Sequence, residues 1–389
     1  MDKRDVRATV LTSGDLVVED PSPLEAALLG RLGLRFPAWS PGSWLAGRRP
    51  RFLLLRAARV AEPLPCGERG VLALHQRAVD RALQAGADGS TGGTAAQSGK
   101  GGLAVLDLKQ ELLRRLLWDC RLCGLGCGGA ADWCPALRPA RYYQHYVHLA
   151  EEREIGPTLA LELAGCSLQC CFCHKGETLI EDHGAFAPLN PSLWEEICSY
   201  PPGSFATISF LGGNPDQSLA GVLNLLAGAP AAGPHWPVVW HTNGYSSPLL
   251  YELLRGVVDL WVFDFKYFSN RCASALSRGR DYVGTAIRAL AAICQRDPSV
   301  PVIVRHLLLP GHEKCCQDPL VEHLAGHWRD RILFHPMGQY VPAWKVRPGR
   351  GPLGRPVPPV RVAELAAQAG RAGLRLGRAV GVRGGGCQC

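Results

Sequence analysis

The chain has 389 residues, 47% of them hydrophobic, with 16 cysteines and a net charge of +8 at pH 7. This length and apolar content predict one large or two to three ordinary domains with a substantial core. No apolar run approaches the ~20 residues that cross a bilayer, which excludes a membrane-spanning protein. Residues 1–5 are charged and no apolar stretch follows them, so we expect no secretory signal. Many cysteines without an export signal predict a cytoplasmic protein with reduced thiols and bound metal.

The positive charge comes largely from arginines, many of them near the C-terminal end. A positive surface attracts polyanions. However, no dense basic block alternates with aromatic residues, and a solvated arginine-rich face explains the charge more simply. We therefore do not expect nucleic acid as a partner.

The first hundred residues carry few motifs. Residues 1–83 mix short apolar pieces with proline and tryptophan and predict a small, partly helical region without a defined role. Residues 84–102 are rich in glycine, alanine, serine and threonine, which predicts a flexible linker. Apolar residues then recur at helical spacing, so that residues 103–118 predict an amphipathic helix.

Four cysteines follow this helix within fifteen residues: Cys120, Cys123, Cys127 and Cys134. That density is typical of a metal site, and the glycines between them allow tight wrapping. We interpret the segment 103–150 as a helix with a cysteine-rich loop that holds a second iron–sulfur cluster or zinc. The alternative is a loop of free thiols that only packs over the neighbouring domain.

Residues 151–345 alternate between apolar runs and helical patterns. The predicted strands are 158–164, 205–211, 237–241, 258–263, 302–309 and 332–335, and the helices between them are 191–199, 218–226, 248–254, 282–295 and 319–328. Such alternation predicts an α/β protein with a parallel sheet. Six units are too few for a closed eight-fold barrel, so we predict an open, partial (β/α)6 barrel with its chemistry at the carboxyl ends of the strands. The segment 346–389 predicts a further helix, 360–369, and a basic tail whose Cys387 and Cys389 could bind metal.

Three further cysteines, Cys166, Cys170 and Cys173, follow the first predicted strand with the spacing C-x3-C-x2-C. A short loop with this spacing can direct three thiolates at one iron–sulfur cube and leave the fourth iron open to a substrate. The alternative is three buried, inert thiols. The neighbouring Cys171 is interpreted as a packed or spare thiol.

The ends of the later predicted strands also carry polar or glycine residues. The second strand ends at Gly212, Gly213, Asn214 and Pro215, the third at Asn243 and Gly244, the fourth at Asp264 and Lys266, and the fifth runs through His306. Alternation along a strand puts Asp264 and Lys266 on the same side. Each of these signals alone is weak, and their order along the strand ends is what favours a common site.

Together these motifs resemble the radical S-adenosylmethionine (SAM) superfamily, and within it the pyruvate-formate-lyase-activating-enzyme-like group. The resemblance covers residues 118–345 and includes, in one branch, Cys120, Cys123, Cys127, His148, Glu151 and Glu152. Asn214 stands where the family has glutamate, and His174 and Lys175 stand where it has glutamine and asparagine.

The resemblance implies a 4Fe–4S cluster on Cys166, Cys170 and Cys173, with SAM chelating the open iron. It implies that Gly212, Gly213, Asn214 and Pro215 hold the methionine end of SAM. It makes Asn243, Asp264, Lys266 and His306 candidates for the ribose and carboxylate.

The expected activity is reductive cleavage of SAM to a 5′-deoxyadenosyl radical that abstracts hydrogen. Its target would be a glycyl-radical enzyme, another protein, a peptide or a small molecule, and its electron donor a protein such as flavodoxin or ferredoxin. Two alternatives remain open: radical SAM modification of RNA, and a non-catalytic nucleic-acid-binding module in which both cysteine sets are structural zinc sites.

Overall fold

The computed structural model describes residues 49–87, 102–129, 138–152, 154–180 and 184–377, single residues 45, 134 and 136, and the backbone of two short strands. These two strands, β1 (Ala8–Val10) and β2 (Leu16–Val18), pair with each other antiparallel. Most of the predicted linker, residues 88–101, and the tail with Cys387 and Cys389 lie outside the described residues.

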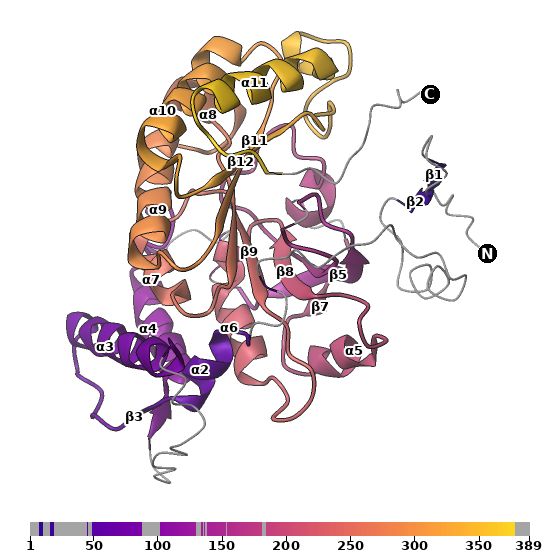
Figure 1. Cartoon of the computed structure of the whole chain (residues 1–389). Coiled ribbons are helices and arrows are strands. Elements are labelled where there is room, and N and C mark those ends of the chain that lie inside the picture. Colours follow the sequence, from indigo (N-terminus) through magenta and orange to yellow (C-terminus); the bar gives the residue numbers. More distant parts are fainter. Residues whose placement is uncertain are drawn as a thin grey trace.

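The centre of the molecule is a sheet of eight strands (Figure 1). Six of them are parallel neighbours in chain order: β6 (Thr158–Leu163), β8 (Thr207–Gly212), β9 (Val238–Thr242), β10 (Leu260–Asp264), β11 (Val302–Leu307) and β12 (Leu333–Met337). These six are the six strands that the sequence predicts, to within two residues at every end. Because consecutive strands are neighbours and β12 does not pair with the far edge, the sheet is an open partial barrel. The predicted fold class is confirmed.

Helices connect the parallel strands and cover the outer face of the sheet. They are α5 (Leu193–Ser199), α6 (Leu219–Ala227), α7 (Pro248–Leu254), α9 (Tyr282–Arg296) and α10 (Asp318–Trp328), and α11 (Pro359–Arg371) follows β12. A short helix that was not predicted, α8 (Asn270–Leu276), follows β10. Wide π-type turns precede β7 and α10, at Gly176–Ile180 and Glu313–Gln317, and short 3₁₀ turns occur at Pro215–Ser218 and Pro352–Gly354. None of the helices in the described ranges is long and apolar enough to cross a bilayer.

Two antiparallel strands extend the sheet beyond β6, and neither was predicted. They are β5 (Arg141–His148), which pairs with β6, and the two-residue edge strand β7 (Ala187–Pro188). At the opposite edge, Leu376 bridges to Phe334 of β12, and the Phe334 amide donates to the Arg375 carbonyl at 2.8 Å. Short segments therefore flank both ends of the parallel array.

The N-terminal helices share one hydrophobic core with the barrel. They are α2 (Phe52–Ala57), α3 (Glu68–Ala87) and α4 (Val105–Trp118), joined by the small antiparallel pair β3 (Arg59–Val60) and β4 (Leu103–Ala104). Helix α4 packs against α6, and one cluster of buried side chains extends from Phe52 to Leu374. The four residues 84–87, which fall in the predicted linker, instead continue α3, because their alanines and glutamine favour a helix.

Candidate functional site

The loop that carries Cys166, Cys170 and Cys173, here called the three-cysteine loop, lies at the carboxyl end of β6. Cys166 and Cys170 are buried, and Cys173 is partly buried. Hydrogen bonds from outside the loop hold its backbone: the Cys171 amide donates to the Leu276 carbonyl at 2.8 Å, and the Arg278 amide donates to the Leu168 carbonyl at 2.7 Å. The loop is therefore shaped by the segment at the end of α8.

The three thiols are poor acids in this surrounding. Burial raises the pKa of each, that of Cys170 to about 12, and the nearby Lys266 ammonium opposes the rise at all three. Without a bound cation the thiols are protonated at neutral pH, so that metal binding must release protons. Within the described ranges, these thiols do not belong to any ligand group whose atoms all lie within 4.8 Å of one another. That spacing is wide for one tetrahedral ion, whose sulfur ligands are about 3.8 Å apart.

The glycines at the end of β8 bring two turns into direct backbone contact. A Cβ on Gly213 would overlap the Gly165 carbonyl, and a Cβ on Gly212 would lie 2.7 Å from the Leu163 nitrogen. Gly165 and Gly212 have φ values of 85° and 104°, which glycine adopts without strain. The Asn214 amide donates to the Gly165 carbonyl at 2.8 Å. The glycine pair therefore seats the β8 turn against the cysteine loop.

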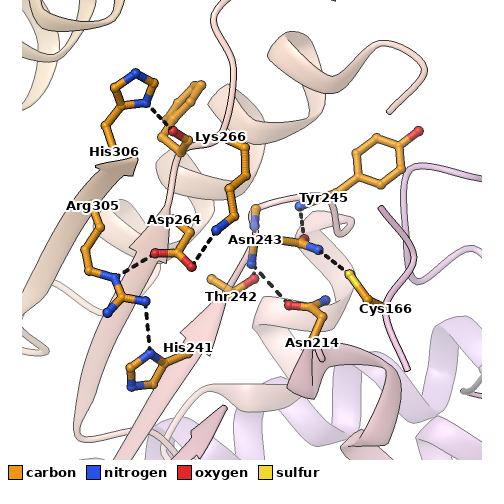
Figure 2. Close-up of polar contacts among 12 residues, drawn as sticks. Cys166, Asn214, His241, Thr242, Asn243, Tyr245, Asp264, Lys266, Arg305 and His306 are labelled. Atoms are coloured by element: carbon orange, nitrogen blue, oxygen red, sulfur yellow. Dashed lines mark hydrogen bonds and ion pairs between the residues drawn. The ribbon is translucent and has the colours of Figure 1, made fainter. Parts of the chain in front are cut away.

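The Asn214 side chain connects the β8 turn to the end of β9, and Figure 2 shows its contact with Asn243. Its Nδ2 donates to Gln217 Oε1 at 2.9 Å, and its Oδ1 accepts from the Asn243 amide at 3.1 Å. Gln217 Oε1 also accepts from the Ser167 amide at 3.3 Å, and Asn243 Nδ2 donates to Cys166 Sγ at 3.5 Å. The result is a closed ring of contacts through the cysteine loop, the β8 turn and the end of β9.

This ring explains why asparagine is suited to position 214. The buried side-chain amide of Asn214 offers a donor, Nδ2, and an acceptor, Oδ1, and both form hydrogen bonds. A glutamate carboxylate offers acceptors only. At this position a carboxylate would face the Gln217 oxygen, and turning the Gln217 amide would remove the acceptor of the Ser167 amide.

A buried carboxylate, Asp216, supports the end of β9 from below. It accepts from Trp240 Nε1 at 2.8 Å, from Thr242 Oγ1 at 2.7 Å and from Ser246 Oγ at 2.6 Å. Burial raises the pKa of Asp216, and these hydrogen bonds oppose the rise. The position of Asn243 thus depends on a residue that none of the predicted motifs includes.

Asp264 and Lys266 lie together, as their alternation along β10 predicts, but they belong to a larger charge network (Figure 2). Asp264 accepts from Lys266 Nζ at 2.9 Å and from Arg305 Nε at 2.7 Å. Burial alone would raise the pKa of Asp264, but Arg305 and Lys266 outweigh it and hold this pKa well below its usual range. Arg305 also binds Glu151 at 2.8 Å. The network therefore keeps Lys266 charged and fixed at the mouth of the barrel.

Glu152, the residue after Glu151, contacts His335 of β12. Glu152 is buried, and its Oε1 lies 2.8 Å from His335 Nδ1 and 3.8 Å from Arg305 Nη1. Burial would raise the pKa of Glu152, yet Arg305 and His335 lower it below its ordinary value. Glu151 and Glu152 thus tie the segment after β5 to β11 and β12.

His306 has one ring nitrogen in use. Its Nδ1 donates to the Phe265 carbonyl at 2.7 Å, which assigns the proton to Nδ1. Its Nε2 is buried without a hydrogen-bond partner, as is the hydroxyl of Ser167 beside Cys166. Burial lowers the pKa of His306 to about 4, so the ring is neutral and Nε2 is a free acceptor at neutral pH.

The loop with the other predicted cysteine set (Cys120, Cys123, Cys127 and Cys134) packs against the segment that follows β9. The Gly124 amide donates to the Tyr245 carbonyl at 3.1 Å, and the Ser247 amide donates to the Leu122 carbonyl at 2.9 Å. Cys120 and Cys134 are buried. Burial raises the pKa of Cys123 to about 12, and its neighbours Cys120, Cys134 and Cys127 raise it further. The thiols of this set thus influence one another electrostatically, and a metal at this place stays a prediction.

The structure brings the predicted strand-end residues to one edge of the sheet. Sequence reasoning did not select Arg305, Asp216 and Gln217 as site residues, although each stands within two residues of a selected position. A buried charge in an apolar strand, such as Arg305 in β11, is the signal that could have found the first of them.

No family model matches the chain. An uncharacterized protein of Methanocaldococcus jannaschii is 28% identical over 254 residues, which cover 62% of this chain and 72% of that protein. Among solved structures, QueE from Escherichia coli aligns with a TM-score of 0.35 and 12% identity over 64% of this chain and 97% of that one. A radical SAM methyltransferase from Sphaerobacter thermophilus aligns with a TM-score of 0.42 and 14% identity over 78% and 92%. Similarity at this level assigns neither a family nor an activity.

Proposed function

We propose that the protein is a radical SAM enzyme whose cluster is held by Cys166, Cys170 and Cys173. One observation carries the proposal: the three-cysteine loop lies at the carboxyl end of the first parallel strand and is joined through Asn243, Asn214 and Gln217 to the next two strand ends. Catalytic residues of (β/α) barrels lie at this end of the strands.

The residues present suit an iron–sulfur cluster with SAM beside it. The three thiols are on one short loop, with Cys166 and Cys170 buried and Cys173 partly buried. His306 Nε2 and Ser167 Oγ are buried without protein partners, and buried polar atoms usually have a partner. Such a cluster, when bound, supplies one electron from an external reductant to SAM, which yields methionine and a 5′-deoxyadenosyl radical that takes a hydrogen atom from the substrate.

The chain's own residues would position the cofactors and exclude water. Asn243 donates to Cys166 Sγ, a contact that stabilises a thiolate. Lys266 is charged and fixed by Asp264, and it can neutralise a carboxylate of SAM. Neutral His306 can accept a hydrogen bond from a hydroxyl at Nε2. The glycines 212 and 213 set the depth of the β8 turn, where the methionine end would lie.

The finer assignments of the resemblance stay proposals as well. These are membership of the pyruvate-formate-lyase-activating-enzyme-like group, activation of a glycyl-radical enzyme or modification of another protein, and a flavodoxin or ferredoxin as electron donor. The positive net charge of +8 is consistent with an acidic electron-transfer partner.

The test is anaerobic reconstitution with iron and sulfide, followed by reduction with dithionite and addition of SAM. We expect 5′-deoxyadenosine from the wild type and none from Cys166→Ser, Cys170→Ser or Cys173→Ser. Cys198→Ser is the matched control, because Cys198 is an exposed thiol on α5. Formation of 5′-deoxyadenosine by any of the three variants, or its absence from a wild type that carries iron and sulfide, contradicts the proposal.

A further inference from the structure

A third group of thiols lies outside both cysteine sets described above. Cys272 is on α8, His312 follows β11, and Cys315 and Cys316 are in the π-type turn Glu313–Gln317 that leads into α10. Forty residues separate Cys272 from the other three in the sequence. The fold nevertheless places one ligand atom of each of the four within 4.8 Å of all the others.

The distances suit a tetrahedral metal. Cys272 Sγ lies 3.5 Å from Cys315 Sγ, and Cys315 Sγ lies 3.4 Å from His312 Nδ1. With zinc–sulfur bonds of about 2.3 Å and zinc–nitrogen bonds of about 2.0 Å, the edges of a tetrahedral site are about 3.8 Å between two sulfurs and about 3.5 Å between sulfur and nitrogen. The ligand atoms at the two measured edges need to move by only a few tenths of an ångström.

The π-type turn explains how two adjacent cysteines reach one point. The His312 carbonyl accepts from the Cys316 amide at 3.0 Å and from the Gln317 amide at 3.3 Å, so the turn is wider than an α-helical one. Adjacent side chains on a regular helix diverge by about 100°. The widened turn lets Cys315 and Cys316 both approach Cys272, and such turns occur frequently at functional sites.

Neither a disulfide nor simple core packing accounts for the group as well as a metal does. A disulfide between Cys272 and Cys315 would need a sulfur–sulfur distance of about 2.05 Å, whereas the observed distance is 3.5 Å. Packing against the core accounts for Cys316, which is 2% exposed, and in part for Cys272 and Cys315, but not for the partly buried His312. A thiol–imidazole hydrogen bond would explain why Cys315 Sγ lies 3.4 Å from His312 Nδ1, but it gives no reason for two further thiols at the same point.

We propose that Cys272, His312, Cys315 and Cys316 form a structural zinc site that joins α8 to the β11–α10 connection. Three thiolates and one imidazole are a common ligand set of structural zinc, and four protein ligands leave no position open for a substrate. Soft sulfur ligands also disfavour magnesium, calcium and manganese.

The position of the site gives it a structural consequence. Cys272 is on α8, and the last residue of that helix, Leu276, accepts from the Cys171 amide of the three-cysteine loop at 2.8 Å. Helix α8 has only seven residues, and helices this short are marginal without tertiary contacts. Zinc would fasten α8 at its first turn while its last turn supports the loop. The zinc site would therefore order the three-cysteine loop from behind without contacting a substrate.

The first experiment counts zinc per chain by mass spectrometry in protein purified without added metal or sulfide. We expect Cys272→Ser and Cys315→Ser each to lose one zinc equivalent relative to the wild type, and Cys198→Ser to lose none. This count does not depend on reconstitution, SAM or activity. A failed 5′-deoxyadenosine assay therefore leaves it unaffected, and a failed zinc count leaves the proposed function unaffected.

A second experiment starts from the wild type, because a cysteine variant could lose zinc simply by misfolding. After a chelator removes zinc, we expect a lower thermal unfolding midpoint that recovers with zinc and not with magnesium. Cobalt in place of zinc should give the intense absorption of thiolate-to-cobalt charge transfer, and Cys315→Ser should weaken it. Unchanged zinc in both cysteine variants, a Cys272–Cys315 disulfide in protein purified without oxygen, or loss of iron and sulfide in place of zinc would each overturn the proposal.

Discussion

The side chain of Lys109 on α4 is completely buried, and it offers a quantitative test of how the N-terminal helices join the barrel. Its Nζ contacts His75 Nε2 on α3 at 2.8 Å and donates to the Arg255 carbonyl after α7 at 2.9 Å. Burial lowers the pKa of Lys109 from 10.5 to about 7, and Arg255 lowers it further while Glu252 opposes the change. The perturbation is Lys109→Met, which keeps the approximate length of the side chain and removes its charge.

The sign of the effect follows from proton binding. The unfolded chain keeps the Lys109 proton up to pH 10.5, whereas the folded chain loses it near pH 7. Between these values the unfolded state binds more protons, so the free energy of unfolding rises with pH. The shift of about 3.5 pKa units corresponds to a total of about 5 kcal/mol. Integrated from pH 7 to pH 9, loss of this proton from the folded state should raise the free energy of unfolding of the wild type by about 2 kcal/mol, which relieves part of that penalty.

The assay is urea unfolding of the wild type and Lys109→Met at several pH values from 6 to 9. We expect the wild type to gain about 2 kcal/mol relative to the variant between pH 7 and pH 9. Arg114→Met on the same helix is the control, because Arg114 is exposed and stays charged throughout this range. A difference between wild type and Lys109→Met that does not change with pH would refute the reasoning.

Three further predictions concern the strand ends. Gly213→Ala should destabilise the fold by roughly 1–3 kcal/mol and reduce iron incorporation, because the new Cβ would have no room. The control Gly326→Ala has open space around it and should change neither stability nor iron content. Equal iron contents in the two variants would contradict the prediction. Asn214→Ala should lower the free energy of unfolding in urea by roughly 1–3 kcal/mol and weaken SAM binding in calorimetry, because two buried partners lose their hydrogen bonds. An unchanged free energy of unfolding together with unchanged SAM affinity would be evidence against the ring of contacts. Asp264→Asn should lower the thermal unfolding midpoint by an amount equivalent to about 3 kcal/mol, because Lys266 and Arg305 lose their shared carboxylate. The control Asp281→Asn changes an exposed residue and should have little effect. Similar shifts of the midpoint in the two variants would argue against the charge network.

Much of the barrel could be predicted from the sequence because its two periodicities are strong. Parallel strands covered on both faces are nearly continuous apolar runs, as β6 is, and the helices between them alternate at a different period. The remaining elements carry weaker signals. The buried face of α3 consists largely of small residues and a histidine beside Val71, Leu74 and Val79, and α8 is short and polar, so both signals are easily overlooked.

The candidate site was predictable in part for a related reason. The ends of consecutive parallel strands meet at one edge, so residues such as Asn214, Asn243 and Asp264 could be grouped from strand order alone. The hydrogen bonds among them depend on side-chain directions that no spacing encodes. The proximity of Cys272 to His312 was not predictable, because it requires the packing of α8 against a turn forty residues away.

The short segments at both ends of the parallel array also bear on how the protein avoids aggregation. An open barrel, unlike a closed one, leaves two strands with unpaired backbone groups that can recruit another chain. Here one border is β7, only two residues long, where Pro188 has no amide hydrogen to offer. At the other, the backbone around Leu376 occupies groups of β12 that would otherwise face outward. Residues 375–377 thus cover the outer edge of β12. A chain that ended before them would leave this edge open to pairing with a strand of another copy of the protein.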